Sequence, residues 1–317
     1  MCGIAGLIGN GRINLDRGTV AKMLSEIEHR GPDASGIWSS DSAVLGGARL
    51  SIVDLNAGPQ PILNESKSLV LVCNGEIFNY LELREDLLSK GHSFRTRTDV
   101  EVLLHLYEEY GKNMLDSVCG QFAFAIYDVE GDALVLGRDR MGVSPLFFFQ
   151  LGQQFLFASE IKALFQVAEV PRKFSQWNLG VSLLTWTVPA PATIYEGIHQ
   201  VEPGTLIEIK QGKKEETQYW SLKFVPQEMS FNDAKESVRA TLVDSVKRNL
   251  VADVPIGLYL SGGVDSSILA GLVAMNSPGK LNAYSVSFKD QVFDESKFQK
   301  EVVEKWGITH HELEISA

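Results

Sequence analysis

The sequence of 317 residues has few of the features that mark secreted, membrane or metal-binding proteins. It has only three cysteines, Cys2, Cys73 and Cys119, too few and too irregularly spaced for a disulfide framework or a CxxC metal site. A reducing, cytoplasmic location is therefore expected. The apolar start of the chain lacks a positively charged segment and is too short to cross a bilayer, so we interpret it as a buried first strand rather than a signal peptide.

Positive charge is also scarce. The chain has 29 lysines and arginines against 40 aspartates and glutamates, a net charge of −11, and it contains no long basic run. A nucleic-acid partner or an anionic membrane surface is therefore not expected, because proteins that bind either usually present a basic face. With 44% apolar and 22% charged residues the chain can form a sizeable core. At roughly 150 residues per domain, the length suggests about two domains.

Hydrophobic periodicity divides the sequence into two regions of different character. Up to about Ser159, short predicted strands alternate with helices, which is typical of α+β or layered α/β organisation. Apolar residues share a helical face in residues 20–27 and 102–110, where Gly111 follows as a stop. The predicted strands of this region are residues 68–73, 122–127, 133–136 and 154–157.

A different composition follows. Residues 170–226 are richer in proline, glycine and tryptophan, and we interpret them as a connecting segment that closes around Phe224. Residues 210–216 within it are interpreted as a polar turn that packs against nothing obvious. We assign residues 1–210 to a first domain with its connecting segment and residues 211–317 to a second, incomplete domain.

The C-terminal region begins with an amphipathic helix that is capped by Asn232 or Asp233. A βαβ unit follows, in which a glycine-rich loop joins a strand to a helix. Its predicted elements are the strand 256–260, the loop 261–267, the helix 265–275, the strand 283–288 and a further strand at 312–315.

Cys2 directly follows the initiator methionine. Removal of Met1 would leave a free α-amino group on a residue that carries a thiol. An α-amine titrates near pH ~8 and a thiol near ~8.5, so the amine can act as general base for its own side chain. The alternative is an ordinary cysteine in a buried strand.

Polar residues that suit an amino-acid substrate lie at predicted chain turns. Asn74 and Gly75 offer a side-chain amide and a backbone N–H, a pair of neutral donors for a tetrahedral oxyanion. As an isolated Asn-Gly pair they would more often form a hairpin turn. Arginines and carboxylates in residues 30–33, 49–54 and 98–101 could hold the α-carboxylate and the α-ammonium group of an amino acid.

Taken in order, the motifs of the first half resemble the glutaminase domain of glutamine-hydrolysing asparagine synthetases. The resemblance covers residues 1–164 and continues more loosely through residues 203–205 and 261–267 to the end of the chain. The motifs are MCGIAG, HRGPDASG, RLSIVDL, GPQP, CNGEIFNY, RTRTDVEVLLHLYEEYG, GQFAFAIYD, RDRMGVSPLFF and FASEIKAL.

This resemblance implies a fold and a set of site residues. The expected fold is an αββα-layered N-terminal-nucleophile hydrolase domain, followed by the start of a doubly wound α/β ATP-pyrophosphatase domain. Cys2 would attack the amide of glutamine, with Asn74 and Gly75 at the oxyanion. The implied glutamine-binding residues are Arg49 for the α-carboxylate and Glu76 with Asp99 for the α-amino end. Val100 stands where the family often has threonine or serine, a minor departure.

The loop of residues 261–267, SGGVDSS, lies where backbone N–H groups and a helix N-terminus would converge on an anion. It lacks the ending of a Walker loop and resembles the pyrophosphate-binding loop of ATP pyrophosphatases. The alternative is a glycine-containing turn that binds no phosphate. The implied ATP-binding residues are Leu260, Ser261, Gly262, Gly263, Asp265, Ser266 and Val286.

Magnesium is expected with ATP, because attack of a carboxylate on a triphosphate requires charge neutralisation. The resemblance implies Asp265 and Glu295 for this ion, although Asp294 is adjacent and the alignment could shift by one residue. His310 and His311 would point to opposite faces of a strand, which argues against a shared metal. Cys73 and Cys119 are expected to be small core residues.

The complete reaction implied by the resemblance is ATP-dependent amidation of aspartate with glutamine nitrogen, giving asparagine, glutamate, AMP and pyrophosphate. One alternative keeps both half-reactions and uses a different carboxylate acceptor. Others are a truncated or split chain with glutaminase activity alone, and a regulatory or scaffold subunit. We expect the 317 residues to hydrolyse glutamine without synthesis, and to form a homodimer or join a partner chain that supplies the rest of the synthetase.

Overall fold

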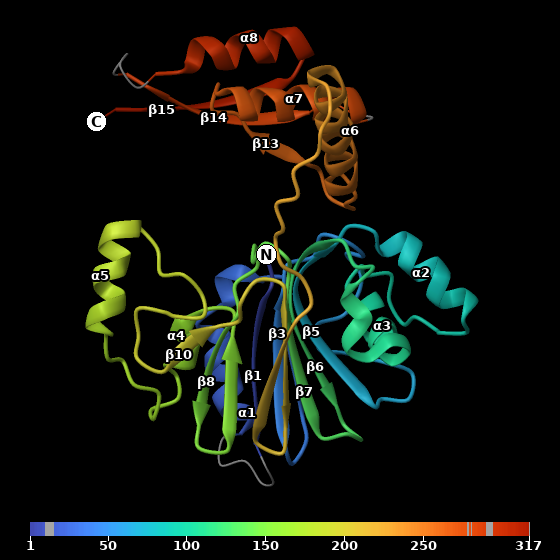
Figure 1. The fold of residues 1–317 in the computed structure, drawn as a ribbon, viewed down its shortest axis with the longest axis vertical. Coiled ribbons are helices and arrows are strands. Elements are labelled where there is room, and N and C mark those ends of the chain that lie inside the picture. The colour runs from blue at the N-terminus through green and yellow to red at the C-terminus, as the bar shows by residue number, and fades with distance from the viewer. Residues whose placement is uncertain (10–15, 278, 280, 290–293, 317) are drawn as a thin grey trace. The chain divides into compact units, whose positions relative to one another are not determined.

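The computed structural model describes residues 1–9, 16–277, 279, 281–289 and 294–316 (Figure 1). The chain divides into two compact units, Met1–Lys223 and Phe224–Ala317. The boundary expected after residue 210 would cut a β-hairpin, and the structure divides the chain after Lys223 instead, next to the Phe224 at which the connecting segment was expected to close.

Two antiparallel six-stranded sheets form the centre of the first unit. The strand order is β10-β8-β9-β1-β3-β2 in one sheet and β12-β11-β7-β6-β5-β4 in the other. The first sheet consists of β1 (Gly3–Gly9), β2 (Ala34–Ser39), β3 (Ala43–Arg49), β8 (Phe147–Leu151), β9 (Gln154–Ala158) and β10 (Ile198–Gln200). The second consists of β4 (Ile62–Leu63), β5 (Leu69–Ile77), β6 (Gly120–Asp128), β7 (Ala133–Arg138), β11 (Thr205–Lys210) and β12 (Lys213–Gln218).

Helices cover the outer faces of both sheets. α1 (Arg17–Ser25) and α4 (Ile161–Leu164) pack on the first sheet, and α2 (Tyr80–Ser89) and α3 (Val102–Tyr110) pack on the second (Figure 1). One apolar cluster lies between the sheets, and one lies under each helical layer. These three interfaces define the four layers of the predicted αββα domain, which is confirmed. The remaining helical elements of this unit are η1 (Glu28–Arg30), η2 (Gly111–Leu115) and α5 (Gln176–Thr185).

The local sequence explains how these elements begin and end. β1 is buried along its whole length because it is central in its sheet and lies between two apolar layers, as its uninterrupted apolar sequence predicted. The Asp16 side chain caps α1 by accepting from the backbone N–H of Thr19 at 3.0 Å. α3 ends at Gly111, whose φ of +54° suits glycine, as predicted.

The segment interpreted as a polar turn, residues 210–216, is part of a β-hairpin. β11 and β12 are joined at Gln211 and Gly212, both with positive φ, and β11 pairs with β7. The interpretation of an unpacked turn was wrong because the charges lie mainly on the exposed β12, while β11 completes the second sheet.

The second unit contains a small parallel sheet with helices. Its strand order is β13-β14-β15, formed by β13 (Gly257–Tyr259), β14 (Asn282–Phe288) and β15 (Thr309–Ile315). Its helices are α6 (Phe231–Asn249), α7 (Val264–Asn276) and α8 (Ser296–Trp306). The parallel strands joined by helices confirm the predicted start of a doubly wound domain. The cap of α6 is Ser230, which accepts from the N–H of Asp233 at 3.2 Å, so the cap predicted at residues 232–233 was wrong.

A search of the helices within the described ranges found none that is long and apolar enough to cross a membrane.

Candidate active site

Cys2 lies immediately before β1, at the edge of a cavity in the first unit. Its Sγ accepts from the backbone N–H of Leu50 at 3.4 Å, and its carbonyl oxygen accepts from Nε of Arg30 at 2.9 Å. Arg30 is itself paired with Glu160 at 3.0 Å. Burial raises the pKa of the Cys2 thiol, while the nearby N-terminus and Arg49 act in the opposite direction. The backbone of Cys2 is therefore fixed, and its thiol needs a base in order to react.

The cavity beside Cys2 has a volume of about 260 Å³. All six residues predicted for nucleophile, oxyanion and glutamine line it, although they come from separate elements. They are Cys2 before β1, Arg49 at the end of β3, Asn74, Gly75 and Glu76 on β5, and Asp99 before α3.

Asn74 and Gly75 occupy the interior of β5, so the alternative of an Asn-Gly hairpin turn is excluded. Asn74 is fully buried, and neither its side-chain nitrogen nor its oxygen has a hydrogen-bond partner among the described residues. A buried amide without a partner is costly, and it is common where a ligand supplies the missing bond. At Gly75 a Cβ would lie 2.2 Å from the carbonyl oxygen of Gln121, so only glycine fits this close strand pairing.

Arg49 makes contacts that the sequence did not predict. Its guanidinium donates to the backbone carbonyls of Val53, Asp54, Ala57 and Gly58, so it holds the loop that forms one wall of the cavity. A substrate carboxylate would have to replace some of these carbonyl contacts.

Glu76 and Asp99 place two carboxylates on the cavity wall. Oδ2 of Asp99 accepts from the N–H of Ile77 at 2.8 Å. Burial, with a smaller contribution from Glu76, raises the pKa of Asp99 to about 6. Burial also raises the pKa of Glu76. The pair can accept hydrogen bonds from an ammonium group, which would offset the cost of burying their charge.

Gln60 and Arg30 support the site through contacts that the sequence did not predict; Arg30, one of the arginines considered for a substrate carboxylate, contacts the Cys2 carbonyl and Glu160 instead. Gln60 lies in the cavity wall, where its side chain donates to the carbonyl of Cys73 at 2.9 Å and accepts from the N–H of Cys73 at 2.6 Å. Arg30 anchors Cys2 as described above. Gln60 belongs to the motif GPQP, and Arg30 belongs to the motif HRGPDASG. A glutamine between two prolines and an arginine beside a glycine are therefore the sequence features that could have indicated these two residues.

A second cavity, of about 490 Å³, lies within the second unit. Leu260, Ser261, Val286 and Glu295, which the resemblance assigns to ATP or magnesium, line it. The other predicted residues, Gly262, Gly263, Asp265 and Ser266, are not among its lining residues and form the adjacent loop and the first turn of α7.

The loop itself suits a phosphate. Gly262 has φ +92°, and a Cβ there would lie 3.0 Å from the carbonyl oxygen of Glu295. Gly263 is the N-cap of α7 and supplies no side-chain cap, so the first N–H groups of the helix are left for a ligand. The hydroxyls of Ser261 and Ser266 lie 3.0 Å apart beside them.

The two adjacent acidic residues next to this cavity, Asp294 and Glu295, make different contacts. Asp294 accepts from the N–H of Phe288 at 3.2 Å and from the hydroxyl of Ser296 at 2.6 Å, which lowers its pKa. Glu295 lines the cavity instead. This difference favours Glu295 over Asp294 as a group for a cation.

The remaining residues considered from the sequence are His311, Cys73 and Cys119. His311 accepts or donates at 3.1 Å to Asn282 and stacks on Tyr284. Cys73 is buried as expected, whereas Cys119 is exposed, so its assignment to the core was wrong. Residue 119 directly precedes β6, where the chain is still at the surface.

Comparison with known proteins gives matches along the whole chain. Residues 1–220 match the family described as glutamine amidotransferase domain, and residues 237–317 match the family asparagine synthase. The chain is 33% identical to the glutamine-hydrolysing asparagine synthetase 3 of Bacillus subtilis, covering 100% of this chain and 54% of the relative. It is 34% identical to asparagine synthetase B of Escherichia coli, with the same coverage, and 32% identical to the amidase chry2 of Gibberella zeae, covering 98% of this chain and 50% of the relative.

The chain thus spans about half the length of these curated relatives. Among solved structures, the glutamine phosphoribosylpyrophosphate amidotransferase of B. subtilis matches with a TM-score of 0.53 at 18% identity, covering 98% of this chain and 65% of that one. A structure titled as the allosteric regulatory enzyme of purine biosynthesis matches with a TM-score of 0.54 at 17% identity, covering 99% and 80%. These structural matches support the fold.

Proposed function

The chain belongs to the glutamine amidotransferase family, in the group of the glutamine-hydrolysing asparagine synthetases, and from that membership we propose that Cys2 hydrolyses the side-chain amide of glutamine. The observation that carries the proposal is the convergence of Cys2, Arg49, residues 74–76 and Asp99 on one small cavity. These six residues, which were predicted from their chemistry and their motifs, come from distant parts of the chain and line the same cavity, with Cys2 at its edge.

In the proposed reaction, removal of Met1 frees the α-amino group of Cys2. The amine takes the proton of Sγ, and the thiolate attacks the amide carbon of glutamine. The side-chain amide of Asn74 and the N–H of Gly75 stabilise the negative charge that develops on the amide oxygen. Ammonia leaves with the transferred proton, and water then hydrolyses the γ-glutamyl thioester to glutamate.

The substrate would be held by its α-substituents. Glu76 and Asp99 accept hydrogen bonds from the α-ammonium group, and their burial makes this charge pairing strong. Arg49 pairs with the α-carboxylate after releasing some of its four carbonyl contacts. Binding of glutamine would therefore also rearrange the loop of residues 53–58.

For the second unit, we propose ATP binding as the family uses it; Asp265 and Glu295 would hold a Mg²⁺ ion, which would neutralise charge on the phosphates. The uncapped N-terminus of α7 would bind the phosphates, and Leu260 and Val286 would border the nucleotide. Within the whole protein, ammonia from Cys2 would amidate aspartate that ATP has activated.

The decisive experiment traps the nucleophile. An electrophilic glutamine analogue is incubated with the protein, and labelled peptides are identified by mass spectrometry. We expect modification of Cys2 in chains that have lost Met1, with protection by glutamine, while the exposed Cys119 serves as an internal control. Labelling of Cys119 and Cys2 at equal rates, without protection by glutamine, would contradict a glutamine site.

The acceptor is identified separately. Glutamate and pyrophosphate are measured in parallel with glutamine, ATP, Mg²⁺ and a panel of carboxylates that includes aspartate. Glutamate alone would assign glutaminase activity to the 317-residue chain, and pyrophosphate that depends on one acceptor would name that acceptor.

A further inference from the structure

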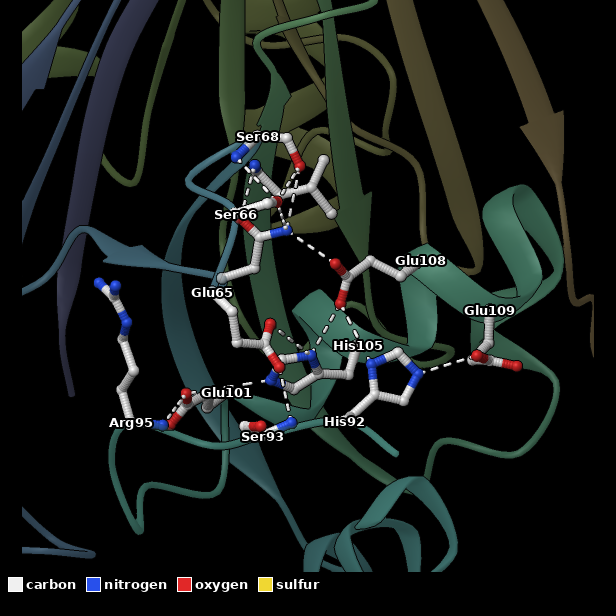
Figure 2. Close-up of polar contacts among 12 residues, drawn as sticks. Glu65, Ser66, Ser68, His92, Ser93, Arg95, Glu101, His105, Glu108 and Glu109 are labelled. Atoms are coloured by element: carbon white, nitrogen blue, oxygen red, sulfur yellow. Dashed lines mark hydrogen bonds and ion pairs between the residues drawn. The ribbon is translucent and has the colours of Figure 1, made fainter. Parts of the chain in front are cut away.

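Two histidines and two glutamates meet at a point of the first unit that takes no part in the proposed reaction. His105 and Glu108 lie on α3, His92 follows α2, and Glu65 lies between β4 and β5. Figure 2 shows the carboxylates of Glu65 and Glu108 directed toward the two imidazole rings. His105 is fully buried, and the side chain of His92 is only 13% exposed. The two histidines are thus largely enclosed by protein, whereas the side chain of Glu65 is 39% exposed.

The potential ligand atoms of the cluster lie close together, at separations of 2.7–3.8 Å for the closest pairs. Oε2 of Glu108 lies 2.7 Å from Nδ1 of His105 and 3.4 Å from Nδ1 of His92, and Oε2 of Glu65 lies 3.8 Å from Nδ1 of His105. One ligand atom each from Glu65, His92 and His105 falls within 4.8 Å of the others. Ligand atoms around a tetrahedral zinc ion, with bonds of about 2.0–2.1 Å, lie roughly 3.3 Å from one another. Small side-chain rotations would therefore complete such a site.

The other nitrogen of His105 gives an independent indication. Nε2 is buried and has no hydrogen-bond partner among the described residues, and the closest carboxylate oxygen, of the fully buried Glu101, lies 4.0 Å away. Glu101 is held in place by the backbone N–H groups of Arg95 and Thr96, each at 2.7 Å. A histidine that binds a metal through one nitrogen typically directs its other N–H at a carboxylate. His105 has Nδ1 in the cluster and Nε2 at 4.0 Å from the Glu101 carboxylate, so a small shift of the ring would bring Nε2 within hydrogen-bond distance of it.

The second glutamate is also oriented for a ligand. Oε1 of Glu108 accepts from Nδ2 of Asn64 at 2.7 Å, which leaves Oε2 for the cluster. Oε1 of Glu65 accepts from the N–H of Ser93 at 2.6 Å, which likewise leaves its Oε2. In the contact between His105 and Glu108 at 2.7 Å a proton must lie between the two atoms, and a divalent cation can take its place.

We propose that Glu65, His92, His105 and Glu108 form a binding site for a divalent transition metal, with Zn²⁺ as the best-suited ion. Two imidazoles and two carboxylates are ligands that zinc accepts in tetrahedral geometry. The ion would tie together α3, the end of α2 and the segment before β5. Because Asp99 lies three residues before the start of α3, the metal would also stiffen the segment that carries this residue of the cavity. The site is independent of the chemistry proposed for Cys2.

Equilibrium dialysis of the metal-free protein with Zn²⁺ tests the proposal. We expect one tightly bound zinc per chain and a rise in melting temperature that a chelator reverses. The variants His92→Asn and Glu65→Gln, at positions that are not fully buried, should weaken zinc binding by more than the roughly 10–100-fold that loss of an outer partner costs. The comparison variant is Glu109→Gln, because Glu109 lies outside the proposed ligand set and contacts Nε2 of His92 at 2.9 Å; as an outer partner its loss should cost no more than roughly 10–100-fold.

Cobalt distinguishes this site from the cysteines. Co²⁺ in the proposed site should give visible bands of a tetrahedral complex without a thiolate charge-transfer band, and His92→Asn should remove them. The proposal is overturned if no zinc is retained, if His92→Asn weakens zinc binding no more than Glu109→Gln does, or if the cobalt spectrum shows thiolate ligation. None of these outcomes depends on glutamine hydrolysis, so failure here and failure of the proposed function are separate results.

Discussion

In the unit Met1–Lys223 the strands β1 and β3 are buried at every position, whereas in the unit Phe224–Ala317 most of β15 is exposed to solvent. The first unit closes its sheets between layers of helices and builds three apolar clusters. The second has three described strands and one small cluster around Leu260, Ala270 and Ala283.

The exposed apolar side chains sharpen this contrast. In the second unit, α6, α7 and α8 form a groove lined by apolar residues that remain accessible. They include Val238, Leu242, Val264, Ile268, Met275 and Phe298. The residues that line the cavity of the first unit thus all come from that unit, while the second unit presents a glycine-rich loop on an incompletely covered sheet. Chemistry in the first unit should depend on its own residues alone.

The largest expected effect tests that independence at the nucleophile. Cys2→Ala should reduce glutamine hydrolysis by about 10⁴-fold or more, because the thiol forms the covalent intermediate. Nucleotide binding by the second unit, measured by calorimetry, should not change. Glutaminase activity that survives the substitution would remove Cys2 from the mechanism, and a chain that is active with Met1 still attached would exclude the α-amine as the base.

A smaller loss is expected at the oxyanion. Asn74→Ala should lower kcat about 10²–10³-fold with little change in KM, since the charge on the amide oxygen develops only in the transition state. The truncation also removes a buried amide that has no partner among the described residues, so stability should be nearly retained. Steady-state kinetics with glutamine and a thermal scan measure both. A rise in KM at constant kcat would instead place Asn74 in ground-state binding.

The residues with the most distinctive chemistry were also the most predictable. A cysteine at position 2, an Asn-Gly pair at the end of an apolar run and a glycine-rich loop between strand and helix each carry meaning without a structure. Buried strands such as β5 and β6 were predicted for the same reason, because their apolar runs exceed what a surface segment would contain.

Long-range contacts were not predictable from local pattern. Nothing near Arg49 indicates that it donates to carbonyls four to nine residues ahead, and nothing near Gln60 indicates a pair of bonds to Cys73. The cluster around His105 is assembled from three segments whose separate sequences are unremarkable for a surface. The hairpin β11–β12 was missed because its charged strand concealed the pairing of β11 with β7.

Because Asp99 is buried in the cavity of the first unit, glutamine hydrolysis by this unit should depend on pH. With the pKa of Asp99 near 6, kcat/KM for glutamine should fall with slope one below about pH 8, as the α-amine is protonated, and with slope two below about pH 6. Asp99→Asn should lower kcat/KM and keep slope one throughout. A slope of two that survives in this variant would assign the second proton elsewhere.

The thermal stability of Asp99→Asn provides a control, because the direction of its pH dependence follows from the pKa of Asp99. The pKa of Asp99 is higher in the folded protein than its ordinary 3.8, so the folded state loses stability as pH rises through about 6. Asp99→Asn should therefore melt at the same or a higher temperature than the unchanged protein at pH 8, and lose this advantage below pH 4. A lower melting temperature at pH 8 would show that the carboxylate stabilises the fold.

The smallest expected effect concerns the second unit alone. Because its core is small and its helices expose apolar side chains, it should melt in a separate transition below that of the first unit.

Gly262→Ala places a side chain at φ +92° and 3.0 Å from the carbonyl oxygen of Glu295, a strain of about 1–3 kcal/mol. This should lower only the earlier transition, by roughly 4–8 °C for each kcal/mol in a unit of this size, and leave glutamine hydrolysis unchanged. Gly279→Ala, at a position where a Cβ meets nothing within 4 Å, is the matched control. Calorimetry of both variants measures the two transitions. A single transition that shifts as a whole would mean that the two units unfold together, and that the core of the first unit is not stable by itself.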